Sequence, residues 1–204
     1  MVLRKGLRGS ASGQAGFLRD ANVRRMKRVA IFGNAGGGKS RLARELAAIT
    51  GLPLHVIDKI RWRPGGTETP YEEYLQAHAA LLARDEWIID GFESIKPAWE
   101  RFEVADTLIH VDLPLRVHAW WVTKRLVKGL FVSPEGWPER SPIIRSSICS
   151  YRVLWPCHRH LTPKYRSYTS EVAQRKRVFH LRSRQELKQF LEAITNEFAA
   201  GRTQ

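Results

Sequence analysis

The sequence has few sulfur-containing residues. Of its 204 residues, two are cysteine and two are methionine. Cys149 and Cys157 lie eight positions apart, a spacing that fits neither a close zinc-binding pair nor a disulfide framework, so we expect reduced, incidental thiols. His158 and His160 adjoin Cys157, but no second cysteine pair or acidic ligand stands nearby. We therefore interpret this cluster as packing or surface rather than as a metal site.

Long apolar runs are also missing. No window approaches the roughly 20 apolar residues needed to cross a bilayer, and the N-terminus lacks the apolar centre of a signal peptide. We therefore expect a cytoplasmic protein with no membrane partner. Apolar residues make up 43% of the chain, with seven Trp and eight Phe, which is enough for the core of one domain. A second full domain is not expected.

Acidic residues are scarce, since 20 Asp and Glu stand against 34 Lys and Arg, a net charge of +14. Residues 1–25 hold six Lys and Arg against Asp20, and residues 141–184 hold ten against Glu171, so these two segments contain the whole excess. A basic surface of this kind neutralises phosphates. It fits nonspecific nucleic-acid binding and equally the rim of a site for polyanionic nucleotides.

Residues 1–25 are polar, rich in Gly, Ser and Arg, and have no sustained periodicity. This composition predicts a disordered basic extension, followed by one domain over residues 26–204. Met26-Lys27-Arg28 directly precedes the first apolar run, and Met1 is the only other methionine. We hypothesise that translation in the cell begins at Met26, and Met1 peptides in mass spectrometry of the native protein would refute this.

Glycine is concentrated in the segment 33–40, which matches the pattern G-x-x-x-x-G-K-[ST] at every fixed position. The apolar residues 29–32 before it are typical of a buried strand, and residues 39–49 after it carry apolar side chains at helical spacing. Glycines allow several backbone N–H groups to converge with a helix N-terminus on phosphate. An accidental glycine-rich turn is the alternative, and the flanking strand and helix disfavour it. The residues expected to bind a nucleotide are Gly33, Asn34, Ala35, Gly36, Gly37, Gly38, Lys39, Ser40 and Arg41.

Two residues of this loop are expected to act in chemistry. Lys39 places a positive charge on the phosphates, and the Ser40 hydroxyl is a ligand for Mg²⁺. The expected donor nucleotide is ATP, and the expected metal is Mg²⁺.

The remaining chain alternates between strand and helix patterns. Gly51 reads as a helix stop, Thr69 as an N-cap with Pro70 in the first turn, and Ser183 with Glu186 as a capping box. Five strands alternating with helices predict an α/β fold with a five-stranded parallel sheet and helices on both faces, a P-loop NTPase. The expected strands are 29–33, 54–58, 87–91, 108–112 and 178–181; the expected helices are 39–49, 71–83, 115–130 and one through 194, with loop over 59–70.

Three carboxylates, Asp58, Asp90 and Asp112, close apolar runs at the sheet edge where ligands bind in this fold class. Each is able to hold Mg²⁺ or accept a hydrogen bond from a substrate hydroxyl, and helix capping or a surface turn is the alternative. That alternative is strongest for Asp112, because Pro114 follows it. We expect Asp90 to join Ser40 at the metal and to be catalytic.

The type of P-loop protein follows from what adjoins Asp90. Motor ATPases and transporters usually place a Glu there to activate water, whereas this chain has Gly91. The guanine-reading tetrapeptide Asn-Lys-x-Asp is absent too. This combination favours transfer of the γ-phosphoryl group to a small acceptor, with water excluded by a mobile cover.

At this point the residues carry a family resemblance. The ordered chain, over about residues 26–194, resembles the small P-loop kinases related to adenylate kinase, of the nucleoside-monophosphate-kinase type, in the group known as DNA topology modulation proteins. Besides the phosphate loop, the elements that carry it are Asp58-Lys59, Ile88-Ile89-Asp90-Gly91-Phe92, Asp112-Leu113-Pro114, Lys124-Arg125 and Gly136-Trp137-Pro138-Glu139-Arg140.

The resemblance implies an acceptor-side helical insert at 59–85 and an arginine-bearing lid at about 125–145. Arg125 and Arg140 would be catalytic by neutralising charge on the transferring phosphoryl group, a role that suits a planar cation with several donors.

Further site residues follow from the same resemblance. Asp58, Lys59 and Arg61 would face the acceptor, and Arg182 would border the nucleotide base. Trp121 stands where we expect another arginine in this family, so the lid chemistry would rest on fewer cations.

The sequence therefore predicts an ATP-binding small-molecule phosphotransferase that transfers the γ-phosphoryl group, with Mg²⁺, to a nucleotide or another small acceptor, as a monomer or homodimer. Trp62, Tyr71 and Tyr74 either stack on an acceptor base or pack the insert. The alternative function is an ATP-binding regulatory protein that contacts DNA through its basic segments. The sequence disfavours a nucleic-acid partner because it has no helix-turn-helix pattern, zinc module or aromatic RNA-binding signature.

Overall fold

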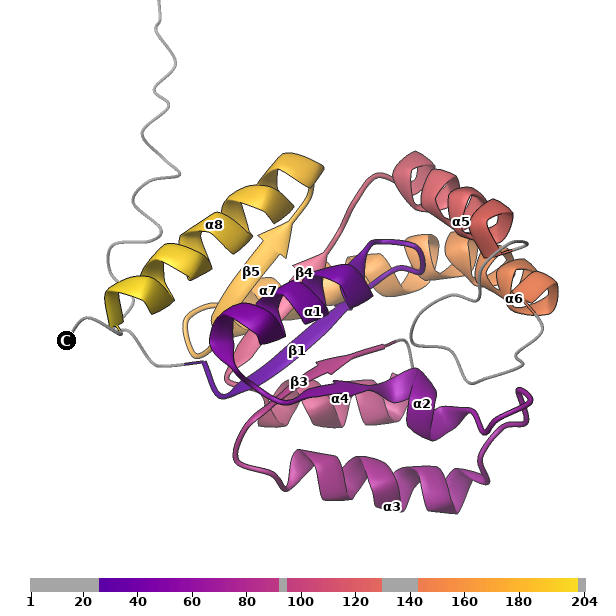
Figure 1. The fold of residues 1–204 in the computed structure, drawn as a ribbon, viewed down its shortest axis with the longest axis horizontal. Coiled ribbons are helices and arrows are strands. Elements are labelled where there is room, and N and C mark those ends of the chain that lie inside the picture. The colour runs from indigo at the N-terminus through magenta and orange to yellow at the C-terminus, as the bar shows by residue number, and fades with distance from the viewer. Residues whose placement is uncertain (1–25, 92–94, 130–142, 202–204) are drawn as a thin grey trace, which may run out of the picture.

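A five-stranded, all-parallel sheet forms the centre of the molecule (Figure 1). The computed structural model describes residues 26–91, 95–129 and 143–201. The strand order is β2-β3-β1-β4-β5. The strands are β1 Arg28–Gly33, β2 Leu54–Val56, β3 Trp87–Asp90, β4 Thr107–Val111 and β5 Arg177–Leu181. The extension expected over 1–25 lies outside the described residues.

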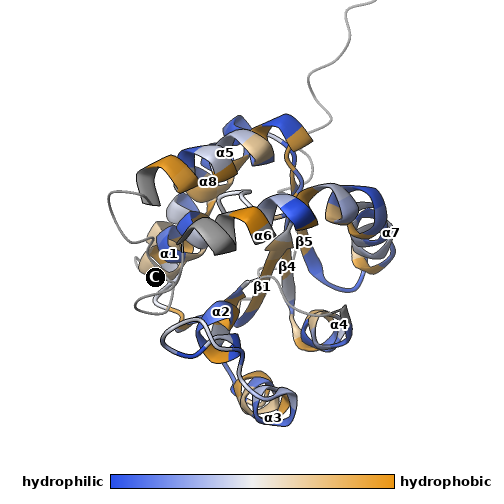
Figure 2. Cartoon of the chain, turned by 90° about the vertical axis from the view of Figure 1, so that its right-hand side faces the viewer, coloured by the Kyte–Doolittle hydropathy of each residue, from blue (hydrophilic) through white to orange (hydrophobic). Residues whose placement is uncertain are grey.

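Helices cover both faces of the sheet, as the sequence predicted (Figures 1 and 2). Helices α1 (Lys39–Thr50) and α8 (Arg184–Gly201) pack on one face. Helices α3 (Tyr71–Leu82), α4 (Ile95–Val104) and α7 (Thr162–Val172) contribute to the core of the other.

The central strand shows why a continuous apolar run suits this position. In β1, Val29 and Ile31 belong to the core beneath α1 and α8, whereas Ala30 and Phe32 belong to the opposite core. Successive side chains of a strand point to opposite faces, so a strand covered on both sides favours apolar residues at most of its positions. The same burial holds along β3 and β4.

Two helices and a short π-helical segment lie beyond the carboxyl ends of the strands. They are α5 (Leu115–Gly129), α6 (Ile143–Pro156) and η2 (Cys157–Leu161). Most of the lid expected at about 125–145 lies outside the described residues. No helix in the described part of the chain is long and apolar enough to cross a membrane.

The strand expected over 54–58 is shorter than predicted. It ends at Val56, and the chain turns into α2 (Ile57–Arg61), so Asp58 lies in a helix and part of the expected loop is helical. Val56 pairs with Asp90, the last residue of β3. Beyond that pair, Ile57 fills the space beside Gly91, where an added Cβ would lie 2.7 Å from the Ile57 Cβ.

Two helix starts can be compared with their predicted caps. Helix α3 has Pro70 at its N-cap with no side-chain cap, so the N-cap predicted at Thr69 is wrong by one position. At α8, the Glu186 N–H donates to Ser183 Oγ at 3.1 Å, which confirms half of the capping box. The Glu186 carboxylate accepts from the Arg182 N–H instead of from Ser183.

Besides α2, four helical segments were not expected: α4, α6, η2 and α7. In α6, η2 and α7, nearby prolines hid the helical pattern in the sequence. Pro156 is the last residue of α6 and precedes η2, and Pro163 lies in the first turn of α7, where a missing N–H is tolerated. The π-helical turn between them keeps the chain helical past both prolines.

Candidate functional site

The segment between β1 and α1 folds around its own lysine. Gly33, Gly36 and Gly38 have φ angles of 136°, 67° and 76°, which side chains rarely adopt. Lys39 is only 8% exposed, and its Nζ donates to the Asn34 carbonyl oxygen at 2.8 Å. Backbone N–H groups and a lysine ammonium are thus gathered at the N-terminus of a 12-residue helix. This arrangement binds phosphate groups.

Helix α5 packs directly against this loop. A Cβ added to Gly36 would lie 2.6 Å from Val122 Cγ2, and one added to Gly38 would lie 2.6 Å from Trp121 Cζ3. The glycines are therefore needed for space as well as for conformation. The loop is supported on its outer side by a helix that begins after β4.

His118, one turn earlier on α5, is bonded to the same loop. Its Nδ1–H donates to the Ala35 carbonyl oxygen at 2.8 Å. Burial is the main cause that lowers the pKa of His118 to about 4, and the nearby Lys39 charge lowers it further. The imidazole is therefore neutral at pH 7 and adds no charge that competes with Lys39.

Helix α6 holds the loop from a second direction. Asn34 is 3% exposed, and its Nδ2 donates to the Leu154 carbonyl oxygen at 2.9 Å. Its Oδ1 accepts from the Ala35 N–H at 2.8 Å. Residues far apart in the sequence thus fix the conformation of the loop.

Asp90 lies at the end of β3, beside β1, in register with Ile31. It is 1% exposed, and its Oδ1 has no hydrogen-bond partner. Withholding a partner from a buried carboxylate oxygen is costly, so this atom needs an explanation, and a bound cation is one. Ser40, exposed in the first turn of α1, lies at the same edge of the sheet. A carboxylate and a hydroxyl are oxygen ligands of the kind that Mg²⁺ takes, so the residues fit the expected metal.

The predicted acceptor residues lie together on one short helix. Asp58, Lys59 and Arg61 all belong to α2, which follows β2, the neighbour of β3. The Arg61 guanidinium bonds the Glu68 carboxylate at 3.2 Å and lies 5.4 Å from the Trp62 ring centroid. These residues therefore stand at the edge of the sheet next to Asp90.

Of the aromatic residues in the insert, Tyr74 is 4% exposed and stacks on His78, so it packs the insert. Tyr71 on the same helix is 54% exposed. From the sequence, Tyr71 and Tyr74 had the same two alternatives, whereas in the structure Tyr74 is buried in the insert and Tyr71 is exposed.

The predicted arginines differ in what surrounds them. Arg41 is exposed and bonds Glu45 at 2.7 Å on its own helix. Arg182 follows β5, and its Nη2 lies 3.1 Å from His180 Nδ1. Arg125 follows Trp121 by one turn of α5; its side chain and the whole of Arg140 lie outside the described residues.

Asp112, the third predicted carboxylate, has protein partners. Arg166 bonds both of its oxygens, and His180 Nε2 donates to Oδ2 at 2.7 Å. Burial opposes ionisation of this carboxyl, but the hydrogen bonds from His180 and Arg166 outweigh it and hold the pKa of Asp112 well below its usual range.

Asp112 and His180, together with His110, form the one group in the described chain with three possible metal ligands within 4.8 Å of one another. The His110 and His180 rings are stacked, with centroids 4.7 Å apart and planes 11° apart. Ring-nitrogen lone pairs lie in the ring planes, so two nearly parallel rings do not converge on one ion. Arg166 also places a positive charge there. We therefore assign this group a structural role.

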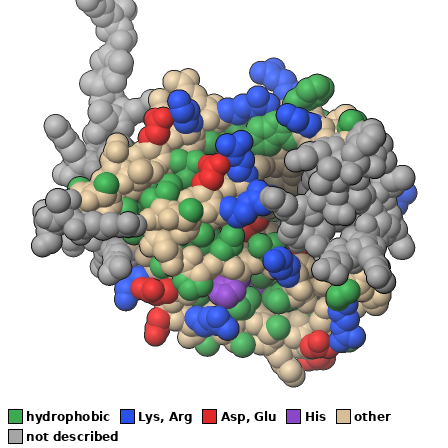
Figure 3. Space-filling view, viewed as in Figure 1, with side chains coloured by type: hydrophobic (Ala, Val, Ile, Leu, Met, Phe, Trp, Pro, Cys, Tyr) green, Lys and Arg blue, Asp and Glu red, His purple; other side chains and the backbone are tan. Residues whose placement is uncertain are grey.

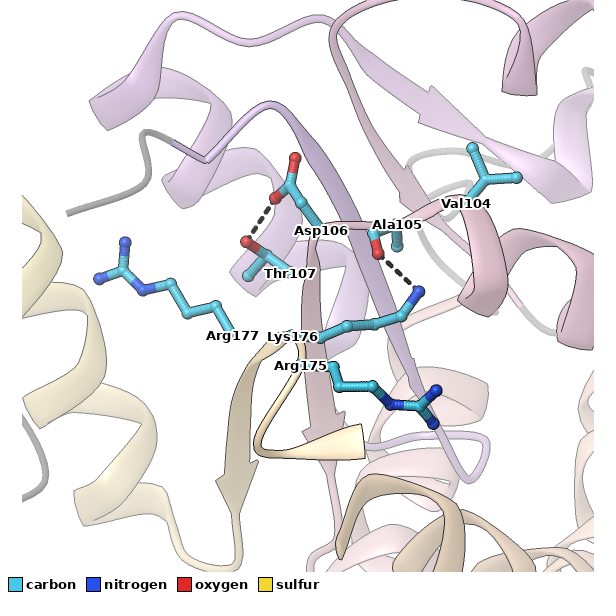
Figure 4. Close-up of a pocket in the computed structure, with 7 residues that line it drawn as sticks. All are labelled: Val104, Ala105, Asp106, Thr107, Arg175, Lys176 and Arg177. Carbon is cyan, nitrogen blue, oxygen red and sulfur yellow. Dashed lines mark hydrogen bonds between the residues drawn. The ribbon is translucent and has the colours of Figure 1, made fainter. Parts of the chain in front are cut away.

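A pocket of about 270 Å³ lies at the opposite end of the sheet, where β4 and β5 begin (Figure 4). Its polar groups are already bonded. Lys176 Nζ donates to the Phe102 and Ala105 carbonyl oxygens at the end of α4, and Asp106 accepts from the Thr107 hydroxyl. This pocket is remote from the loop and offers no free reactive group to a ligand.

The sequence did not reveal the residues that support the loop, His118 and Leu154, or those that bind Asp112, Arg166 and His180. A signal existed only for His118, because positions 118, 121, 122 and 125 recur at helical spacing and therefore share one face of α5. The Leu154 contact uses a backbone carbonyl, which any residue type supplies.

Lys and Arg side chains gather over the upper and central part of the face shown in Figure 3. Among the described cysteines, Cys157 is free and buried. Burial raises the pKa of Cys157 to about 11.

Comparison with known proteins gives a fold but no family. No protein-family model matches the chain, and no curated protein matches it. Among solved structures, it is similar to shikimate kinase from Acinetobacter baumannii in complex with shikimate, with a TM-score of 0.52, 14% identity, and coverage of 88% of this chain and 96% of that one. Less similar are shikimate kinase from Bacteroides thetaiotaomicron (TM-score 0.47, 12% identity, 85% and 99% coverage) and deoxyadenosine kinase from M. mycoides (0.46, 13%, 84% and 98%). The sheet and the first likeness establish an α/β fold of the nucleoside-monophosphate-kinase type.

Proposed function

We propose that the protein is an ATP-dependent kinase that transfers the γ-phosphoryl group to a small acceptor. The observation that carries this proposal is one juxtaposition: β1 leads into a glycine loop folded around Lys39, and its neighbour β3 ends at Asp90, whose buried Oδ1 has no partner. The first element binds phosphate, and the second fits a divalent cation that phosphate requires. The kinase fold of the chain agrees with this assignment.

The reaction is a displacement at phosphorus. The acceptor hydroxyl oxygen forms a bond to the γ-phosphorus, the bond from that phosphorus to the β,γ-bridging oxygen breaks, and ADP leaves. A carboxylate at the acceptor edge, for which we propose Asp58, accepts a hydrogen bond from the acceptor hydroxyl and takes up its proton as the bond to phosphorus forms. Positioning and charge stabilisation perform most of the catalysis in such a transfer.

Each element of the chain has a part in that positioning. The loop amides and Lys39 hold the β- and γ-phosphates, while Ser40 and Asp90 would hold Mg²⁺, which screens the phosphate charge. Helices α5 and α6 keep the loop in place through His118 and Leu154. Arg125 follows the loop-facing positions of α5 by one turn, which supports its proposed role on the transferring group. Arg140 remains a proposal from the family resemblance.

The finer assignments belong to the same proposal. Within this fold, the resemblance supports the adenylate-kinase-related group, ATP as the donor and Mg²⁺ as the metal. We place the enzyme in the cytoplasm as a monomer or homodimer. Residues 59–85 would form the acceptor side, because α2 and α3 lie beside the strand that bears Asp90.

The test is a screen for ADP release across nucleoside monophosphates, nucleosides and small hydroxylated metabolites, with hydrolysis in the absence of acceptor as the reference. We expect at least one acceptor to raise ADP release above that reference, and Lys39→Ala to abolish the increase without loss of helical circular dichroism. Lys188→Ala is the matched control, since Lys188 is an exposed lysine on α8. Turnover retained in Lys39→Ala would overturn the assignment. A salt-sensitive DNA shift without turnover, surviving removal of residues 1–25, would favour the regulatory alternative.

A further inference from the structure

Most of the exposed large hydrophobic side chains of the described chain lie on two adjacent helices. Of eight such residues, six belong to α5 or α6. Trp120 and Trp155 are the most exposed, at 61% and 60%. Soluble proteins leave single apolar residues at the surface, but a concentration of this kind marks a surface that contacts something else.

The two helices run in opposite directions along this surface. The loop contacts α5 at residues 118–122 and α6 at Leu154, so these positions lie at the same level. Thr123 follows these positions on α5, whereas Tyr151 precedes Leu154 on α6, and the hydroxyls of Thr123 and Tyr151 are hydrogen-bonded to each other. Moving forward along α5 therefore corresponds to moving backward along α6.

This register arranges the exposed side chains in opposing pairs. One turn from the Thr123–Tyr151 pair, Trp120 stands opposite Trp155; one turn the other way, Val127 stands opposite Ile148. We call the surface formed by Trp120, Val127, Ile148, Tyr151 and Trp155 the outer α5–α6 face. It is continuous, because Trp120 and Val127 lie two turns apart on α5, and Ile148, Tyr151 and Trp155 recur at three- and four-residue spacing on α6.

The charge around this face has one sign. Arg116, Lys124, Arg152 and Arg159 are exposed and make no ion pair within the described part of the chain. No Asp or Glu occurs in residues 115–134 or 140–170. A partner that complements this face is therefore anionic and also has an apolar layer.

The opposite sides of the same helices touch the phosphate loop. Trp121 and Val122 of α5 pack on its glycines, and Leu154 of α6 bonds Asn34. The apolar residues of the outer α5–α6 face are therefore not needed to hold the helices on the domain. Their exposure is an independent feature of the sequence.

We propose that the outer α5–α6 face binds an anionic phospholipid surface. Indole rings and a tyrosine beside Val and Ile suit the boundary between headgroups and acyl chains, while surrounding Arg and Lys meet the lipid phosphates. A nucleic acid would use the rings and cations but gives no role to Val127 and Ile148. A second copy of the chain would bring cations against cations. Contact with a lipid surface needs no spanning helix, so this proposal departs from the expectation of no membrane partner only by adding peripheral binding.

The experiment is co-sedimentation of the full chain with vesicles of phosphatidylcholine alone and of phosphatidylcholine with phosphatidylglycerol. We expect binding only to the anionic vesicles, reduced at least tenfold in Trp120→Ala/Trp155→Ala. Tyr71→Ala is the matched control, because Tyr71 is a comparably exposed aromatic residue on α3 and should leave binding unchanged. Tryptophan quenching by brominated lipid should likewise fall in the double variant and persist in the control.

Several results would overturn the proposal. One is failure of the wild type to bind anionic vesicles. Another is equal binding by the double variant, which would mean that charge alone attracts the chain, for example through residues 1–25. A third is loss in the double variant of binding to single-stranded DNA instead of vesicles. Circular dichroism of the double variant checks folding; if it is altered, Trp120→Phe/Trp155→Phe with the same quenching measurement decides the question.

Discussion

Arg166 of α7 binds Asp112 at the end of β4 through two parallel hydrogen bonds, Nε to Oδ2 at 2.7 Å and Nη2 to Oδ1 at 3.0 Å. The Asp112 side chain is 4% exposed, whereas that of Arg166 is 52% exposed. This pair ties a helix of one layer to the strand next to the phosphate loop, whose residue Gly33 is in register with Val111. A residue expected at a ligand edge thus has a structural partner.

Arg166→Ala should destabilise the fold by about 2 kcal/mol, because a buried carboxylate loses two charge-assisted hydrogen bonds and retains only His180. Urea denaturation at pH 7 measures the change. Arg175→Ala is the control, since Arg175 forms an exposed pair with Glu171 at 3.7 Å and should matter by less than about 0.5 kcal/mol. Equal effects of the two substitutions would contradict the structural role of Asp112.

Stability should fall as the pH is lowered from about 6.5 towards 4. Burial lowers the pKa of His110 to about 3, so between pH 6.5 and 3 the unfolded chain binds a proton that the folded chain does not. Acid therefore favours unfolding in this window, by about 2 kcal/mol for this group between pH 7 and pH 5. His118, whose pKa is lowered to about 4, acts in the same direction.

Denaturation midpoints at pH 7, 6 and 5 test this dependence. His110→Phe, which keeps a ring between Phe32 and His180, should flatten it. The carboxyl of Asp112 titrates far below this window, so its loss of stabilisation appears only under stronger acid. An unchanged midpoint in the wild type from pH 7 to pH 5 would refute the prediction.

Gly36→Ala should weaken ATP binding and destabilise the loop. Its φ of 67° costs alanine about 1 kcal/mol, and contact with Val122 Cγ2 at 2.6 Å adds about 1 to 3 kcal/mol of overpacking. Gly65→Ala is a matched control, because Gly65 has a φ of 86° but nothing within 4 Å of the added Cβ. Calorimetric titration with ATP should distinguish them; comparable binding by both variants would show that contact with α5 is unimportant.

Asp90→Asn should raise the denaturation midpoint without nucleotide while reducing turnover. The substitution removes a buried charge whose Oδ1 has no partner, and also the proposed Mg²⁺ ligand. We expect turnover to fall by about a hundredfold, or ~2.7 kcal/mol of transition-state stabilisation. Asp85→Asn, at a fully surface carboxylate with 96% exposure, is the control. Full activity of Asp90→Asn would remove Asp90 from the mechanism.

The sequence predicted those parts of the fold in which local pattern and tertiary environment agree. The apolar runs at β1, β3 and β4 are continuous because both faces of these strands are covered. Gly51 ends α1 as expected, with a φ of 76° and its N–H bonded to the Ala47 carbonyl oxygen. Failures occurred where neighbours decide: β2 stops because β3 has no further partner for it, and α6, η2 and α7 continue past prolines.

The sequence by itself determined the phosphate loop and its flanks, since the pattern of glycines, Lys39 and Ser40 needs only one strand and one helix to take effect. Only the tertiary structure decided the fates of the three strand-terminal carboxylates. Asp90 has a buried oxygen without a hydrogen-bond partner, Asp112 is hydrogen-bonded to Arg166, and Asp58 lies in a helix. The physical reason is that a carboxylate's role depends on which donors surround it, and those donors come from segments distant in the sequence.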